Sequence, residues 1–238
     1  FLNIDNFNFE LKTNDPKVFF KNKEIKIKTI STDLPLQNLF SKKMNLKEIK
    51  ILTHKNRVQN VIEVIRAYKN NPQLFILNNV VKDGFINIES KISFNEDGSI
   101  KNNYVVDGNI EDLKIELLNN SVVEKINLSF LIRSEEYLIY NVSSLYQSIK
   151  INSNQIKITE SQNNYKFEGD ISNQTSEIDL KHFFNFFSNN IKSILKEKLT
   201  ISSNNKFSFK LSKKIEFSDI NFQSKITLEK LQYSNDVF

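Results

Sequence analysis

Apolar and polar residues alternate along most of this 238-residue chain. Ile86, Ile88, Ile92 and Phe94 share one parity, and Asn, Glu, Lys and Ser residues stand between them. Successive side chains of a β-strand point to opposite faces of its sheet, so this pattern predicts strands with one apolar and one polar face. The same alternation recurs in later segments, notably residues 126–132, 207–211, 215–217 and 226–228.

Short polar segments separate the alternating runs and predict turns. Asn95–Gly98 is the clearest of them, because Gly98 can adopt a positive φ. Strands that are joined by such short turns pair antiparallel. The sequence therefore predicts a mainly β protein built around a long antiparallel meander of about twelve to fifteen strands. The other predicted turns are residues 119–120, 152–154, 161–164 and 202–205.

Two segments change to the helical period and predict amphipathic helices near residues 56–70 and 179–197. Asn70, Asn71 and Pro72 are expected to end the first helix, and Asp179 is a candidate cap for the second. A short helical turn is also expected at residues 36–40. Both long helices are expected to pack on a sheet, with closure of a groove or contact with a membrane surface as the alternative. The first apolar stripe consists of Val58, Val61, Ile62, Ile65 and Tyr68.

The composition argues against most kinds of catalytic, metal-binding and nucleotide-binding site. The chain has no cysteine, two histidines and four glycines, which excludes disulfide scaffolds and thiolate metal sites and argues against a glycine-rich nucleotide loop. The formal net charge is +5, but 28 acidic residues are mixed with 33 basic ones, unlike a concentrated nucleic-acid-binding patch. His54 and His182 have no triad or ligand pattern near them. We therefore expect a protein that is not an enzyme, needs no cofactor or metal and binds no nucleic acid.

A sheet with one apolar face must cover that face. A helix is about 10 Å wide, which is about two strand spacings, so two helices cannot cover a dozen strands. The sheet can fold into a sandwich, close into a barrel, or curl into an open trough that holds a ligand. The absence of Trp argues against the aromatic girdles of a membrane barrel. The residue pattern alone favours the sandwich over the trough.

If the trough forms, one parity of the strands would line it. Lipid acyl chains suit such a surface, since each buried CH₂ contributes about 0.8 kcal/mol without a polar partner. The alternating Lys and Asn residues would keep the outer face hydrated. The candidate lipid-binding residues are Ile86, Ile88, Ile92, Phe94, Val106, Ile110, Ile126, Leu128, Phe130, Ile132, Phe207, Phe209, Phe217, Ile226 and Leu228.

The order of segments in the first 70 residues resembles a known family. Leu2–Asn6 opens a strand, Ile25–Ile30 and Leu46–Ile51 form two more, and Asp33–Leu36 lies between them with an amphipathic helix after them. This order is similar to that of the AsmA-like family of bacterial envelope proteins, of the AsmA, TamB and YhdP type. The middle of the chain also resembles the repeats of large members, at Gly84–Ile88, Asp97–Ile100 and Gly108–Leu113.

The resemblance implies a meander that curls into an open hydrophobic groove, with the β-sandwich as the alternative. It implies transfer of phospholipid along the groove between the inner and outer membranes, in outer-membrane biogenesis. The parent protein would be anchored in the inner membrane through segments outside this chain and would reach into the periplasm. Residues 1–238 would then be one β-groove segment of a longer protein. The rival function is that of a structural or adhesive β-sandwich domain of a surface protein.

Overall fold

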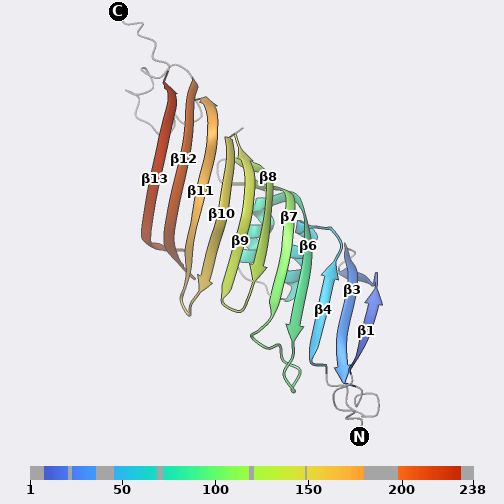
Figure 1. Ribbon diagram of the computed structural model, residues 1–238. Coiled ribbons are helices and arrows are strands. Elements are labelled where there is room, and N and C mark those ends of the chain that lie inside the picture. Colours follow the sequence, from blue (N-terminus) through green and yellow to red (C-terminus); the bar gives the residue numbers. More distant parts are fainter. Residues whose placement is uncertain are drawn as a thin grey trace, which may run out of the picture. The chain divides into compact units, whose positions relative to one another are not determined.

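The computed structural model describes residues 8–20, 23–35, 46–68, 72–117, 121–147, 149–179 and 198–231. These residues form a mainly β structure with one open antiparallel sheet of thirteen strands and two helices (Figure 1). The strands are β1 (Asn8–Asn14), β2 (Lys17–Phe20), β3 (Lys23–Pro35), β4 (Glu48–Thr53), β5 (Asn56–Arg57), β6 (Val81–Ser93), β7 (Val105–Glu116), β8 (Val122–Ile132), β9 (Glu136–Tyr146), β10 (Ile149–Glu160), β11 (Asn164–Asp179), β12 (Lys198–Ser212) and β13 (Phe217–Leu231); the helices are α1 (Val58–Tyr68) and α2 (Pro72–Val80).

The strand order confirms the predicted meander. Neighbours in the sheet follow the chain in the order β1-β3-β4-β6-β7-β8-β9-β10-β11-β12-β13, while β2 pairs with β3 and β5 pairs with β6. The described residues thus form one open sheet, and the two packed sheets of the alternative sandwich are not found among them. The chain divides into two compact units, unit 1 (Phe1–Ile139) and unit 2 (Tyr140–Phe238).

Helix α1 confirms the first predicted helix and ends at Tyr68, just before the polar residues that were expected to stop it. The sequence pattern does not predict helix α2, because Pro72 follows a predicted helix and is expected to end it. Proline is compatible with the first turn of a helix, since the N–H that it lacks has no intrahelical partner there. Pro72 is in fact the first residue of α2.

The second predicted helix was expected to begin at Asp179, which lies in a strand. Asp179, the candidate cap, is the last residue of β11 and pairs with Lys198 of β12. Residues 180–197 of that helix, and the helical turn expected at residues 36–40, lie outside the described residues.

Two of the predicted turns are wrong. Residues 152–154 lie inside β10 and residues 202–205 lie inside β12, so both strands are longer than the polar interruptions suggested. The turn at Asn95–Gly98 is confirmed: Gly98 has a φ of 82°, and its N–H donates a 3.0 Å hydrogen bond to the carbonyl of Asn95. Residues 161–163 also form a turn between β10 and β11, and residues 118–120 lie outside the described part.

The core of unit 1 forms where α1 packs on the apolar face of β6, β7 and β8 (Figure 1). Ile62 of α1 is 3% exposed, and Val58 at the start of the helix is buried beside it. Their spacing of four residues places both on one side of the helix, toward the sheet. The strand residues buried in this cluster are Val81, Ile86, Leu113, Ile126 and Phe130.

Bulges shape the strands next to this core. Asp112 in β7 and Lys125 in β8 have positive φ values of 50° and 52°, at places where the pairing of the two strands shifts. The side chain of Asn127 joins the two positions: its Oδ1 accepts the N–H of Asp112 at 3.1 Å, and its Nδ2 donates to the carbonyl of Lys125 at 3.0 Å. Bulges bend and twist a strand locally. Here they occur beside Leu113 and Ile126, which enter the core.

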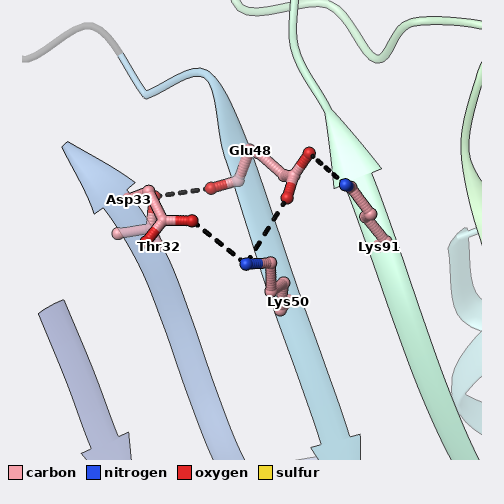
Figure 2. Close-up of polar contacts among 5 residues, drawn as sticks. All are labelled: Thr32, Asp33, Glu48, Lys50 and Lys91. Carbon is pink, nitrogen blue, oxygen red and sulfur yellow. Dashed lines mark hydrogen bonds and ion pairs between the residues drawn. The ribbon is translucent and has the colours of Figure 1, made fainter. Parts of the chain in front are cut away.

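Charged side chains form a ladder over β3, β4 and β6 (Figure 2). Lys50 lies 3.0 Å from Asp33 and 3.9 Å from Glu48, and Glu48 lies 3.1 Å from Lys91. The hydrogen bond to Asp33, helped by its negative charge, raises the pKa of Lys50 above its usual value. The Thr32 hydroxyl donates to the carbonyl of Glu48 at 2.5 Å. Exposed ion pairs stabilise little, so this ladder mainly keeps that face of the sheet polar.

The packing of α1 makes a direct prediction about stability. We expect Ile62→Ala to lower the free energy of unfolding by about 2–4 kcal/mol, because it opens a cavity between α1 and the sheet. Ile65→Ala makes the same chemical change on the same helix, where the side chain is 45% exposed. It should cost less than about 1 kcal/mol. Urea unfolding followed by circular dichroism measures both, and equal losses would contradict the assigned helix face.

Candidate functional site

Eight of the candidate lipid-binding residues lie under or beside α1. Ile86, Ile126 and Phe130 are buried in the cluster with the helix. This placement leaves the three residues little surface for a ligand, since each is at most 9% exposed. The other five pack against the same cluster and are partly buried: Ile88, Val106, Ile110, Leu128 and Ile132.

Ile92 and Phe94 lie outside that cluster. Ile92 of β6 pairs with Ile49 of β4, and Phe94 forms a bridge with Ile100 after the strand ends. Both Ile92 and Phe94 are half-buried. The remaining five candidates, from Phe207 onward, belong to unit 2, and there the apolar surface is far more accessible.

The register of unit 2 brings aromatic side chains together on one face. Phe207 pairs with Phe222 of β13, and Phe209 pairs with Phe167 of β11. The rings of Phe167 and Phe209 stack with their centroids 4.7 Å apart, and Phe217 lies against Phe209 at 5.5 Å. Paired residues of adjacent strands share a face. We call this the unit 2 apolar face, which consists of Phe167, Ile201, Phe207, Phe209, Phe217, Phe222, Ile226 and Leu228.

The exposed part of this face lies on β13. Phe217 is 62% exposed, Phe222 63%, Ile226 57% and Leu228 56%. Large apolar side chains exposed side by side are typical of surfaces that bind a partner or a ligand. In the described residues of unit 2 every element is a strand, so no helix among them covers the face as α1 does in unit 1.

Hydrogen-bonded polar side chains cross the unit 2 apolar face. The Asn205 side chain accepts from Ser224 at 2.6 Å and donates to Ser203 at 2.9 Å and to the carbonyl of Ile171 at 3.0 Å. The Ser203 hydroxyl in turn donates to Asn173. We call Asn173, Ser203, Asn205 and Ser224 the Asn–Ser belt. It runs across β11, β12 and β13 and separates the aromatic side chains from an aliphatic group.

The pairing of the strands places the belt between these two parts. Phe207 and Phe222 are paired on one side of it, and Ile201 and Leu228 are paired on the other. Sequence reasoning missed the belt because it read residues 202–205 as a turn. A signal was available: Ser203 and Asn205 have the same parity as Phe207, and Ile201 continues that parity beyond them.

Polar side chains cover the opposite face and a nearby crevice. Lys166 forms an ion pair with Glu168 at 2.7 Å, and Lys210 forms one with Asp219 at 2.7 Å. All four side chains are exposed. A crevice of about 600 Å³ is lined mostly by polar residues, including Asp170. The carboxylate of Asp170 accepts the N–H groups of residues 154 and 155 at 3.1 Å and so completes the hydrogen bonding of a bulge in β10.

The surroundings of Tyr165 raise the pKa of its phenol. Its phenol lies 3.4 Å from Glu160, and burial is the largest of the effects that raise its pKa above the usual value. The negative charge of Glu160 and the hydrogen bond to it raise the pKa further.

The chain has two histidines, and the structure describes one of them. His54 lies 2.7 Å from Asp15, and both side chains are exposed. His182 lies outside the described part of the chain. Within the ranges that the structure covers, no three His, Asp or Glu side chains gather in a way that would hold a metal ion.

Comparison of this chain with protein-family models, with curated proteins and with solved structures finds no match.

The Asn–Ser belt yields a prediction of its own. Asn205→Ala removes three hydrogen bonds from a half-buried position, and we expect the free energy of unfolding to fall by about 1–2 kcal/mol. Asn204→Ala changes the same residue type one position earlier, on the opposite face, where the side chain is exposed. It should change stability by less than about 0.5 kcal/mol. Chemical unfolding of both variants tests whether the belt holds the strands together.

Proposed function

We propose that the unit 2 apolar face binds the acyl chains of phospholipids. The observation that carries the proposal is the row of large apolar side chains on β13, each more than half exposed. Exposing such a row to water is unfavourable. An acyl chain that covers it contributes about 0.8 kcal/mol of binding free energy for each buried CH₂. Acyl chains need no polar partner, so a surface made of aromatic and aliphatic side chains suits them.

The dimensions of the face support this ligand. Ile158 of β10 pairs with Phe167, so β10 borders the same face. Four strands, β10 to β13, extend over about 14 Å, which is three strand spacings of about 4.8 Å. One leaflet of a bilayer holds its acyl chains within about 15 Å, half of the hydrocarbon core. A single acyl chain that lies across these four strands would therefore remain in contact with apolar side chains over its length.

The wider role belongs to the same proposal. The parent protein would move phospholipid along a hydrophobic β-groove between inner and outer membrane and so contribute to outer-membrane biogenesis, without enzymatic activity. The resemblance to the AsmA-like family supports this part, including a periplasmic location and an anchor in the inner membrane outside this chain. Neither helix in the described residues is long and apolar enough to cross a membrane. The rival, an adhesive sandwich, has less support because the described strands form one open sheet.

Substitutions on β13 test the proposal without disturbing the core. Ile226 and Leu228 lie on the unit 2 apolar face, whereas Thr227, which pairs with Ser202, lies on the opposite face of the same strand. All three are exposed. Phe130 is a poorer choice, because a charge there would enter the core beneath α1.

We expect the double variant Ile226→Asp/Leu228→Asp to reduce the phospholipid that co-purifies with the chain by about tenfold or more, since two carboxylates would face the acyl chain. Thr227→Asp should retain the wild-type amount. Mass spectrometry of extracted lipid measures this, with circular dichroism to confirm that the variants stay folded. Wild-type protein without bound phospholipid, or an equal loss in Thr227→Asp, would refute the proposal.

A further inference from the structure

None of the nine residues of helix α2 is buried. Phe75 is 54% exposed, Ile76 47% and Leu77 44%. Isolated helices of this length are marginal in water, and most helical stability in proteins comes from packing an apolar face. Helix α2 instead presents its most apolar side chains to the outside. An additional surface that covers them would stabilise it.

The arrangement of these side chains indicates what kind of surface fits. Phe75, Ile76 and Leu77 are consecutive, and at about 100° per residue they spread over about 200° of the helix circumference. A groove on a protein takes a narrow stripe of residues spaced three and four apart. A bilayer surface surrounds an inserted element on several sides, so it can cover all three side chains at once.

Charge points to the same partner. The sequence of α2, PQLFILNNV, contains no charged residue. Arg66 of α1 lies over the ring of Phe75, with its guanidinium carbon 5.4 Å from the ring centroid. Among the residues that the structure describes, no carboxylate forms an ion pair with Arg66. Arg66 thus places a positive charge beside Phe75 that is not paired with a carboxylate of the described residues, and such a charge suits the phosphate groups of an anionic bilayer.

We propose that α2 is a membrane-contact element that inserts Phe75, Ile76 and Leu77 into the surface of a lipid bilayer with anionic headgroups. Ile65, on the neighbouring helix α1, is exposed as well. The contact goes beyond the proposed function, because it concerns docking on a bilayer rather than binding of single lipids. It involves unit 1, whereas the acyl-chain surface lies in unit 2.

The chain contains no tryptophan, which allows a direct test. In the Phe75→Trp variant the single indole reports on its surroundings. We expect its emission to move to shorter wavelength when vesicles of phosphatidylcholine with phosphatidylglycerol are added. Gln73→Trp places the same probe at an exposed polar position of the same helix and should move much less. No shift for Phe75→Trp would overturn the proposal. The proposal would also be overturned if the emission shifted when the protein concentration was raised without vesicles, since a second copy of the chain would then cover α2.

A flotation assay with the same vesicles measures the contribution of the side chains. Phe75→Ser/Ile76→Ser should lower the bound fraction, expressed as a partition coefficient, by about tenfold or more. Gln73→Ser/Asn79→Ser makes two changes at exposed polar positions of α2 and should bind like the wild type. Arg66→Gln should weaken binding only when phosphatidylglycerol is present. Equal binding of both double variants would contradict the inference.

Each of the two proposals can be refuted without refuting the other. If α2 docks on bilayers and unit 2 holds acyl chains, Phe75→Ser/Ile76→Ser loses vesicle binding and keeps its co-purified phospholipid. Ile226→Asp/Leu228→Asp then shows the reverse behaviour. Loss of both properties in either variant would contradict the separation of the two surfaces.

Discussion

An alternating sequence obliges the protein to cover one side of its sheet. In unit 1 this requirement is met locally, because α1 packs Val58 and Ile62 against apolar residues of β6, β7 and β8. In unit 2 the described residues include only strands, and the apolar side chains of β13 stay in contact with water. The contrast between a covered and an uncovered face of the same kind is the basis of the proposed acyl-chain surface.

Local backbone features adapt the long strands to this task. Positive φ values at Asp112 and Lys125 allow bulges beside the core, and the Asn127 side chain satisfies the backbone groups that these bulges leave unpaired. Asp170 does the same for a bulge in β10. On the polar face, charges of both signs alternate between strands, as at Asp33 and Lys50. Polar side chains thus support the irregular backbone, while apolar ones determine which face is available to a ligand.

Alternation predicted the antiparallel meander well, because the period of two residues in a strand is a geometric necessity. The stripe of α1 was equally clear. Prediction failed where polar residues had more than one structural role. Ser203 and Asn205 are typical turn residues, yet they lie within β12 and form hydrogen bonds to the neighbouring strands. Pro72 is expected to end one helix and in fact begins another. The burial of Phe130 depends on α1 packing above it, which periodicity within β8 cannot reveal.

The Asn–Ser belt has a consequence for the precision of strand pairing. If β13 slipped by two residues along β12, every side chain would still point to its original face, so the apolar pattern alone gives little protection against that error. The same slip would separate Ser224 from Asn205, and a slip of β12 along β11 would separate Ser203 from Asn173. The four polar residues of the belt thereby fix the register of three long strands, and they do so at positions where apolar side chains would otherwise enlarge the apolar face.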